Sequence, residues 1–377
     1  MLCKARERSP RFLSGGVREK SLLGAVCDSG RMKAHAVAVK LRRGEEARRK
    51  LKEAGLLSEE LLLKNDGTEL LLPLTAEPEE ERLKEILRGI RYRLLVADFQ
   101  QRPKRPKSYR DLLHLPDDLM ELLPTSYDIV GEIIILKLPE ELYPHRQEIG
   151  EALLKIHKGV RTVALDRGVK GEYRVRDLEV IAGNENLETT HVENQIKIMV
   201  DVSKVYFSPR LSAERARVSS QVREGEVVLD MFSGAGPFAI TIARNSPARK
   251  VYAVDVNPAA YEYLERNIHI NHVEDRVEAF LGDALDIVPT IDDKIDRIVM
   301  NHPTSAMDFL PLSFEKVFPG GVIHLYLLLE SSEVPKMARE IGEKAKEIGR
   351  RIKIISLREV KGYSPTSSIF CFDLEVD

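Results

Sequence analysis

The residues best suited to chemistry lie between Asp230 and Asp255, where two acids flank a glycine turn. The apolar run 227–229 ends at Asp230, the turn holds Gly234 and Gly236, and a second apolar run ends at Asp255. An acid that ends the second strand of such a unit can accept hydrogen bonds from both hydroxyls of a ribose, and glycines let the backbone approach a ligand. The spacing therefore predicts a site for a cofactor that contains adenosine.

Two local features bear on whether this cofactor carries phosphates. Gly234, Gly236 and Ala239 also fit the dinucleotide fingerprint, so the glycine spacing alone is ambiguous. However, Asp230 would repel a pyrophosphate, and Pro237 removes an N–H donor at the start of the following helix. Both features favour S-adenosyl-L-methionine, which carries an ammonium and a sulfonium but no phosphate. A strand–helix–strand unit without a ligand is the alternative.

A third polar turn, Asn301-His302-Pro303, follows the apolar strand 297–300. In a doubly wound sheet this turn falls beside the cofactor crevice. Enzymes that methylate exocyclic amines resemble it with Asn-Pro-Pro-aromatic, but the second Pro and the aromatic residue are missing here. We therefore expect the target to be a ring nitrogen that bears a proton, and such an atom needs a general base. A strand end capped by Asn is the alternative without chemistry.

The segment 206–215 precedes the glycine unit and carries Arg210 and Glu214 four residues apart. Pro209 can open a helix that places both side chains on one face. A surface ion pair is the ordinary interpretation of that spacing. The residues alone do not favour a catalytic role over it.

Strands and helices alternate through the C-terminal half, which predicts a parallel sheet covered by helices on both faces. A long helix over 334–349 and two final strands follow, and these strands suggest a hairpin at the sheet edge. Upstream, a second α/β region includes a predicted strand over 129–138, and residues 33–100 read as a compact α/β module. The predicted fold class is α/β, with a Rossmann-like domain preceded by a middle and a small N-terminal α/β domain.

Composition shifts divide the chain into five segments. Residues 1–31 mix Arg, Ser and Gly without periodicity, so we expect a disordered or non-native extension there. Residues 32–100 are the predicted N-terminal docking domain, 101–110 a basic Pro-rich linker, 111–202 the middle domain and 203–377 the Rossmann-like domain. Contact with RNA phosphates is a second use for the linker.

The composition limits the partners and the compartment. Lys and Arg number 58 and Asp and Glu 60, so a net charge of -2 gives no overall attraction to nucleic acid. The cysteines Cys3, Cys27 and Cys371 show no paired spacing, so neither a disulfide framework nor a zinc site is indicated. No apolar run approaches the roughly 18–20 residues of a membrane helix. We predict a cytoplasmic monomer that does not bind membranes.

Several segments together resemble the archaeal and eukaryotic tRNA (guanine-N1)-methyltransferases that act on guanosine 37. They are SYDIVGEIIILKL, GEYRVRDLEVIAG, DVSKVYFSPRLSAERARV, VVLDMFSGAGPFAI, AVDVNPAAYEYLERNIHIN, VMNHP, GGVIHLY and YSPTSSIFCFDLEV. The resemblance covers nearly the whole chain after Met32. It implies tRNA as partner, an N-terminal domain that recognises the outer part of tRNA, an RNA-binding middle domain, and a class I methyltransferase domain that uses S-adenosyl-L-methionine.

The resemblance also implies roles for individual residues. Glu214 would remove the N1 proton of guanine, and Arg174 would hold O6 as negative charge develops there. The residues implied to bind the cofactor are Asp230, Phe232, Gly234, Gly236, Asp255, Asn257, Asp283 and Asn301. Those implied to position the flipped base and the RNA backbone are Tyr206, Arg210, Asn301 and Pro303.

Some alternatives stay open. Relatives commonly have Asn-Leu-Pro where this chain has His302 in the middle, so His302 is either a tolerated wall residue or alters which base fits. Carbon methylation of the tricyclic wyosine precursor, aminocarboxypropyl transfer at the same nucleotide, and tRNA binding without turnover are the competing functions. The aminocarboxypropyl enzymes that resemble this fold lack the PRLSAER stretch, so Arg210 and Glu214 discriminate. A divalent cation that assists proton removal also stays open.

Overall fold

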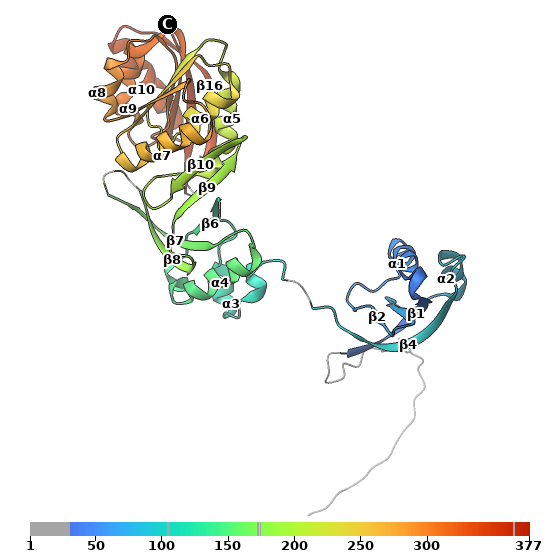
Figure 1. The fold of residues 1–377 in the computed structure, drawn as a ribbon. Coiled ribbons are helices and arrows are strands. Elements are labelled where there is room, and N and C mark those ends of the chain that lie inside the picture. The colour runs from blue at the N-terminus through green and yellow to red at the C-terminus, as the bar shows by residue number, and fades with distance from the viewer. Residues whose placement is uncertain (1–30, 104–105, 172, 174, 365) are drawn as a thin grey trace, which may run out of the picture. The chain divides into compact units, whose positions relative to one another are not determined.

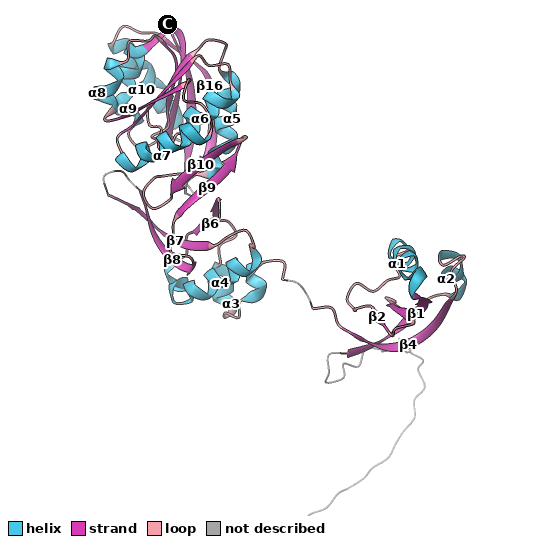
Figure 2. Cartoon of the chain, in the orientation of Figure 1, coloured by secondary structure: helices cyan, strands magenta, loops and turns pink. Residues whose placement is uncertain are grey.

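The computed structural model describes residues 31–103, 106–171, 173, 175–364 and 366–377 of the chain (Figure 1). The extension predicted for residues 1–31 lies outside the described residues except for Arg31, which begins the first strand. The chain divides into two compact units between residues 105 and 106. This division falls inside the segment 101–110, where the sequence predicts a linker. Both units contain helices and strands (Figure 2).

The first unit is a four-stranded sheet with two helices. Its strands lie in the order β2-β3-β1-β4, and the central β1 is antiparallel to both neighbours. Because side chains alternate along β1, Val37 and Val39 pack in the cluster that includes helix residues, whereas Ala36 and Ala38 pack with Phe99. The elements are β1 (Arg31–Lys40), α1 (Gly44–Glu53), β2 (Lys64–Asn65), β3 (Glu69–Pro73), α2 (Glu80–Ile86) and β4 (Tyr92–Gln100).

The second unit begins with a four-stranded sheet in the order β5-β6-β7-β8. The prediction of one strand over 129–138 is wrong, because the chain reverses between β5 and β6. Gly131 at this reversal has φ +53°, and a Cβ there would lie 2.3 Å from Thr189 Oγ1, so only glycine fits. The elements are α3 (Asp117–Leu122), β5 (Asp128–Val130), β6 (Ile133–Leu136), α4 (Arg146–Ile156), β7 (Thr162–Lys170) and β8 (Val175–Gly183).

A hairpin of β9 (Glu188–Glu193) and β10 (Ile196–Asp201) follows. Two amides of α7 (Pro258–Ile270) and its C-cap bind the edge of β10. Asn267 exchanges hydrogen bonds with the N–H and C=O of Met199 at 2.7 and 2.9 Å, and Asn271 does the same with Lys197 at 2.9 and 2.7 Å. The hairpin therefore packs on the helices of the next sheet, although it precedes residue 202.

The last sheet has seven strands in the order β13-β12-β11-β14-β15-β17-β16. The first five are parallel, β17 runs antiparallel to β15, and β16 is the antiparallel edge. The predicted α/β class, the parallel sheet and the C-terminal hairpin are confirmed. The elements are α5 (Ser212–Gln221), β11 (Val227–Asp230), α6 (Pro237–Asn245), β12 (Lys250–Asp255), α7, β13 (Val277–Leu281), α8 (Ala284–Ile287), β14 (Ile295–Met300), α9 (Ala306–Lys316), β15 (Val317–Glu330), α10 (Val334–Glu347), β16 (Ile352–Gly362) and β17 (Ser367–Val376).

Helices cover both faces of this sheet (Figure 1). The alternation along β11 shows why: Val228 belongs to the core with α5, α6 and α7, whereas Val227 and Leu229 belong to the core with α9 and α10. Within the described part of the chain, no helix has the length and apolarity that crossing a membrane requires. The carboxyl ends of the parallel strands meet at one edge, and the polar residues predicted from the sequence lie there.

Candidate active site

Two acids flank the glycine turn at the carboxyl edge of the seven-stranded sheet. β11 ends at Asp230 and the parallel neighbour β12 ends at Asp255, so both acids lie at the same edge. Asp255 Oδ2 accepts a hydrogen bond from Gly234 N–H at 2.6 Å, and Oδ1 accepts one from Asn257 N–H at 2.9 Å. The Asp255 carboxylate thus joins the turn to the N-terminus of α7, where Asn257 is the N-cap.

The two glycines of the turn serve different needs. Gly234 has φ +54°, and a Cβ there would meet only Tyr206 O at 3.7 Å. Gly236 is the N-cap of α6 with φ +84°, and a Cβ there would lie 2.4 Å from Leu264 Cδ1. Gly234 is therefore required by backbone conformation, whereas Gly236 is also required because α6 lies directly against α7.

Asp230 lies behind the turn and is 1% exposed. Its Oδ2 accepts a hydrogen bond from Ala239 N–H at 3.2 Å, but Oδ1 accepts none from the described residues. Burial raises the pKa of Asp230 to about 7, and the nearby charge of Asp255 adds to the rise. Burial also raises the pKa of Asp255. Because burial disfavours the charged form of both carboxyl groups, a cationic ligand at this edge of the sheet would stabilise their ionised forms.

A cavity of about 870 Å³ lies against the turn. Of the residues predicted from the sequence, nine line it: Tyr206, Arg210, Phe232, Gly234, Asp255, Asn257, Asp283, Asn301 and Pro303. Asp230, Gly236 and Glu214 are not among the described residues that form its lining. The predicted catalytic residue Arg174 lies outside the described residues.

An aromatic wall closes one side of the cavity. The ring of His302 lies 5.2 Å from that of Phe232, which meets Phe309 edge-on at 4.9 Å. These three rings come from the turns after β11 and β14 and from α9, and all of them line the cavity. His302, where this chain differs from the Asn-Leu-Pro of its relatives, thus lies in the wall of the cavity beside the predicted residues Asn301 and Pro303.

The cavity is also lined by an ion cluster around Asp128, of which only Arg210 is predicted from the sequence. Asp128 Oδ1 accepts from Arg210 Nε at 2.5 Å, and Oδ2 accepts from Arg176 Nη2 at 3.1 Å. Arg176 also pairs with Asp166 at 3.3 Å and lies 5.6 Å from the ring centroid of Tyr206. Burial opposes the ionisation of Asp128, yet the two guanidinium groups hold its pKa below the usual range.

Lys361 of β16 adds another cation to the cavity lining. Its Nζ donates to Ser208 Oγ at 3.1 Å, and it pairs with no carboxylate in the described part of the chain. Burial lowers the pKa of Lys361, although the charge of Asp128 opposes the change. The cavity lining therefore combines Asp255 and Asp283 near the glycine turn with the cations Arg176, Arg210 and Lys361. The segments SYDIVG and GEYRVRDLEV contain Asp128 and Arg176, but nothing in their local pattern marks these residues.

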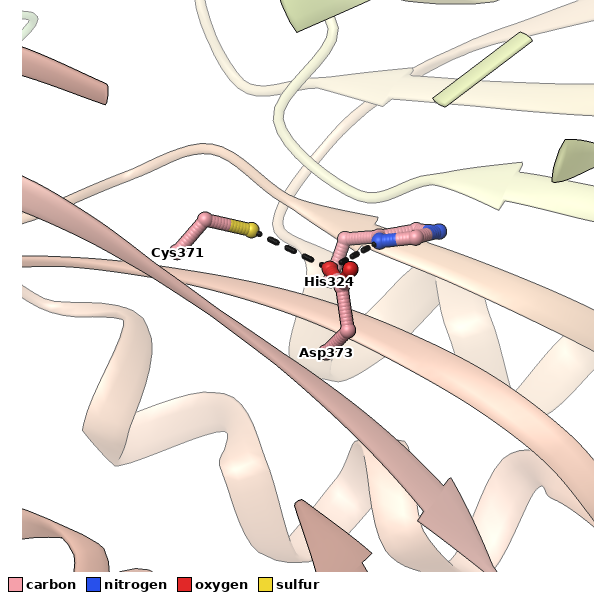
Figure 3. A group of neighbouring side chains, drawn as sticks. All are labelled: His324, Cys371 and Asp373. Carbon is pink, nitrogen blue, oxygen red and sulfur yellow. Dashed lines mark hydrogen bonds and ion pairs between the residues drawn. The ribbon is translucent and has the colours of Figure 1, made fainter. Parts of the chain in front are cut away.

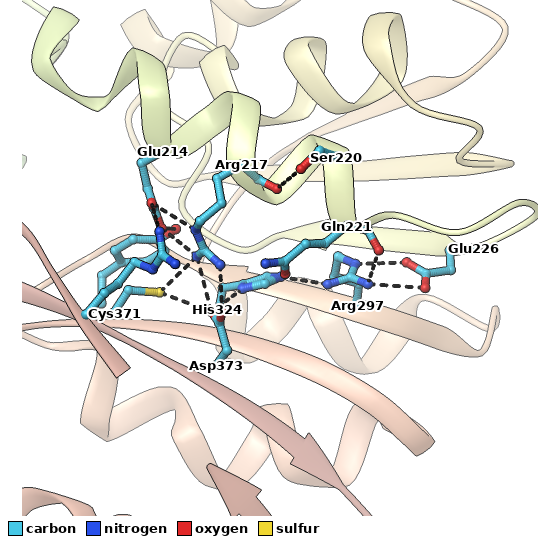
Figure 4. A network of polar contacts seen from close by, with 11 residues as sticks. Glu214, Arg217, Ser220, Gln221, Glu226, Arg297, His324, Cys371 and Asp373 are labelled. Atoms are coloured by element: carbon cyan, nitrogen blue, oxygen red, sulfur yellow. Dashed lines mark hydrogen bonds and ion pairs between the residues drawn. The ribbon is translucent and has the colours of Figure 1, made fainter. Parts of the chain in front are cut away.

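Glu214 lies in a buried polar network beside the sheet (Figure 4). Arg217 binds both carboxylate oxygens, with Nε to Oε2 at 2.9 Å and Nη2 to Oε1 at 2.6 Å. The hydroxyl of Tyr326 donates to Oε1 at 2.8 Å. Arg217 also binds Asp373, with Nη1 to Oδ2 at 2.6 Å. Burial favours a neutral Arg217, but the carboxylates of Glu214 and Asp373 outweigh it and raise the pKa of Arg217.

Three possible metal ligands, His324, Cys371 and Asp373, meet in the same network (Figure 3). Arg297 Nη1 lies 2.8 Å from His324 Nε2, and because a guanidinium only donates, Nε2 is the acceptor and Nδ1 carries the proton. That proton is donated to Asp373 Oδ1 at 2.6 Å. Burial lowers the pKa of His324, in keeping with a neutral ring. With both ring nitrogens engaged and Arg217 and Arg297 alongside, this geometry favours a hydrogen-bonded cluster over cation binding.

Three family models match successive parts of the chain. The TRM5/TYW2 methyltransferase domain matches residues 189–355, the TYW2 N-terminal domain matches 109–186, and the tRNA methyltransferase 5 N-terminal domain matches 36–82. The first match begins at β9, so it includes the hairpin that packs on α7. Together these models cover both units of the structure.

Individual relatives match over most of their length. The tRNA (guanine(37)-N(1))-methyltransferase Trm5b of Pyrococcus abyssi is 40% identical over 90% of this chain and 98% of its own. The tRNA(Phe) (4-demethylwyosine(37)-C(7)) aminocarboxypropyltransferase of Pyrococcus horikoshii is 33% identical over 70% of this chain and 93% of its own. The solved complex of aTrm5 and tRNALeu matches with TM-score 0.75 and 34% identity over 91% of this chain and 99% of that one. The chain therefore belongs to the Trm5-type tRNA (guanine(37)-N(1))-methyltransferase family.

Proposed function

We propose that this protein transfers a methyl group from S-adenosyl-L-methionine to N1 of guanosine 37 in tRNA. The observation that carries the proposal is the single cavity that joins the acid–glycine–acid edge to the cluster around Asp128. One end suits a cofactor with positive charge, and the other end offers cations and aromatic rings to a nucleotide. The 40% sequence identity with the Pyrococcus abyssi relative over 90% of this chain supports the same reaction.

The residues at the glycine turn fit S-adenosyl-L-methionine. The Asp255 carboxylate lines the cavity and can accept from the ribose hydroxyls, and Asp283 and Asn257 line the same end. Asp230 does not line the cavity, but its buried Oδ1 accepts no hydrogen bond from the described residues, so its carboxyl group favours positive charge nearby. When bound, the cofactor supplies an electrophilic methyl group. Gly234 leaves the backbone open for its approach, since only one atom lies within 4 Å of a Cβ built there.

The guanine would enter between the wall of Asn301 and Pro303 and the ring of Tyr206, a position that requires the base to be flipped out of its stack. N1–H of guanine is amide-like, so its removal needs a base and moves charge onto O6. Glu214 is proposed as the base and Arg174 as the group that holds O6, as the family resemblance implies. Arg210, which is bound to Asp128, would position the base or the RNA backbone.

The test is methyl transfer from labelled S-adenosyl-L-methionine to unmodified tRNA with guanosine, adenosine or inosine at position 37, followed by nucleoside analysis. We expect N1-methylguanosine with guanosine, and a loss of roughly a hundredfold or more for Glu214→Gln. Glu188→Gln is the matched control, because Glu188 accepts from Tyr263 at 2.5 Å and does not line the cavity. If the wild-type protein labels none of these tRNAs while binding both ligands, N1 methylation is excluded.

Aminocarboxypropyl transfer at the same nucleotide is the second candidate, and the Pyrococcus horikoshii relative favours it. Arg210 and Glu214 in the PRLSAER stretch favour methyl transfer instead. The two reactions give nucleosides of different mass, so the same assay on tRNA that carries the wyosine precursor separates them. Carbon methylation of that precursor would add one methyl group without altering guanosine.

The predicted monomeric state, the cytoplasmic location and any divalent cation remain predictions. A monomer is consistent with tRNA being a large partner by itself. Light scattering of the free protein and of its tRNA complex tests the oligomeric state. Methyl transfer with and without chelator tests the cation.

A further inference from the structure

Glu214 lies in the buried network around Arg217 (Figure 4). Glu214 is 6% exposed and is absent from the described residues that line the cavity. Oε1 accepts from both Arg217 and Tyr326, and Oε2 accepts from Arg217. Arg358 Nη1 lies 4.0 Å from Oε2. A carboxylate held in this way cannot reach a proton on a base in the cavity. If Glu214 is the general base, its side chain has to exchange these partners first.

Arg217 has a second carboxylate partner that would remain when Glu214 leaves. Asp373 accepts from Arg217 at 2.6 Å through Oδ2 and at 3.2 Å through Oδ1. His324 and the thiol of Cys371 donate to Asp373 Oδ1 at 2.6 and 3.3 Å, so the acid is fixed from the sheet side. Removing one partner of a buried charge pair is costly because the other charge stays buried without compensation. Asp373 removes most of that cost, since Arg217 keeps a bidentate partner.

The charge of Asp373 is set by groups other than Glu214. The neutral His324 transfers no charge to Asp373, and Arg297 at its other nitrogen is paired with Glu226 at 2.8 Å. Hydrogen bonds from His324 and Arg217 overcome the effect of burial and lower the pKa of Asp373. Because neither group belongs to Glu214, we expect Asp373 to stay an anion when Glu214 leaves. The Tyr326 hydroxyl, in contrast, donates to Glu214 only while Glu214 occupies the network.

We propose that Arg217 and Asp373 are positioning residues that let Glu214 leave the network for the cavity, and that the Tyr326 hydroxyl opposes this movement. The inference rests on the proposed function, because it takes Glu214 as the base in methyl transfer. It assigns opposite effects to two residues of one network. A network with a purely structural role would give both residues the same effect.

The experiment is single-turnover methyl transfer with enzyme in excess and both substrates saturating. In Asp373→Asn, departure of Glu214 leaves Arg217 without a carboxylate, so the rate is expected to fall by about tenfold or more while the tRNA Kd is unchanged. In Tyr326→Phe, one hydrogen bond to the carboxylate is lost from the inactive arrangement alone, so the rate is expected to rise by roughly threefold to tenfold. Thermal unfolding is recorded for both variants.

Two matched controls test the same chemical changes elsewhere. Tyr252→Phe removes a hydroxyl that donates to Asp293 at 2.8 Å, and Asp296→Asn alters a carboxylate that accepts from Val227 N–H at 2.8 Å. Neither residue lines the cavity, so both controls should keep the wild-type rate. A faster single-turnover rate for Tyr326→Phe supports the proposal even if Asp373→Asn does not fold.

The failures are distinguishable. If Tyr326→Phe slows transfer as Glu214→Gln does, Glu214 acts from its present position and the inference is wrong. A parallel loss of rate and thermal stability in both variants assigns the network to stability alone. If Glu214→Gln is as fast as wild type, the role of Glu214 fails while tRNA methylation stands. If the wild-type protein forms no N1-methylguanosine, the proposed function itself fails.

Discussion

Gly236 is the position where a single added carbon should do most damage to the site. A Cβ there would lie 2.4 Å from Leu264 Cδ1 and 3.1 Å from Ile240 Cδ1, and φ is +84°. The left-handed conformation costs an L-residue roughly 1–2 kcal/mol, and overpacking costs about 1–3 kcal/mol. We expect Gly236→Ala to lose about 3 kcal/mol of stability, or roughly 6–12 °C in Tm. Affinity for S-adenosyl-L-methionine should fall as well, because Gly236 is the N-cap of α6 in the glycine turn.

Gly225 provides a control in which the conformational cost stands alone. It has φ +80° and no atom within 4 Å of a built Cβ. Gly225→Ala should therefore lose only about 1 kcal/mol, or roughly 2–4 °C. Differential scanning calorimetry of both variants, with and without cofactor, measures the difference that crowding makes. Equal losses for the two variants would show that α6 and α7 adapt to the added methyl group and that close approach does not explain Gly236.

Two further changes test the electrostatics of the cavity. Lys361→Met keeps an apolar stem and removes a cation without a carboxylate partner in the described chain, so tRNA Kd should rise up to about tenfold and the salt dependence should lose about one counterion. Cofactor affinity should not change. Lys346→Met, at an exposed lysine, is the control. If the salt dependence of tRNA binding is the same in Lys361→Met and wild type, Lys361 does not contact RNA phosphates. Because burial raises the pKa of Asp230 from 3.8 to about 7, the folded protein without ligand holds a proton that the unfolded chain releases. Stability should then fall as pH rises from about 4 to 7, by about 1.4 kcal/mol per unit at most, and Asp230→Asn should lack this slope in urea unfolding. Identical slopes would mean that Asp230 is ionised throughout.

The acid–glycine–acid arrangement could be predicted because its residues lie close together in the sequence. Asp230, Gly234 and Asp255 are joined by one strand–turn–helix–strand unit, and parallel pairing of β11 and β12 brings both acids to one edge. Each step follows from short-range pattern and sheet geometry. The reversal at Gly131 was missed because an apolar run on both sides hides a glycine that is explained only by contact with Thr189, 58 residues later in the chain.

The ion cluster around Asp128 is assembled from distant segments, and this is why only its member Arg210 was predicted as a site residue. Asp128 comes from β5, Arg176 from β8 and Lys361 from β16, on two different sheets. Each is an ordinary charged residue in its own strand. The packing of the two sheets within the second unit places all three residues in the lining of one cavity. Spacing along the chain carries no information of that kind.

For the pair Arg210 and Glu214, the contact suggested by their spacing differs from the contacts in the structure. Four-residue spacing suggests an ion pair on one helical face, but α5 begins only at Ser212, and residues 209–211 form a separate 3-10 turn. Arg210 therefore points to Asp128, and Glu214 binds Arg217 on the next helical turn instead. The two residues face different environments, one in the cavity and one behind it. The proposed role of Glu214 as general base then requires a movement, which neither helical periodicity nor family resemblance predicts.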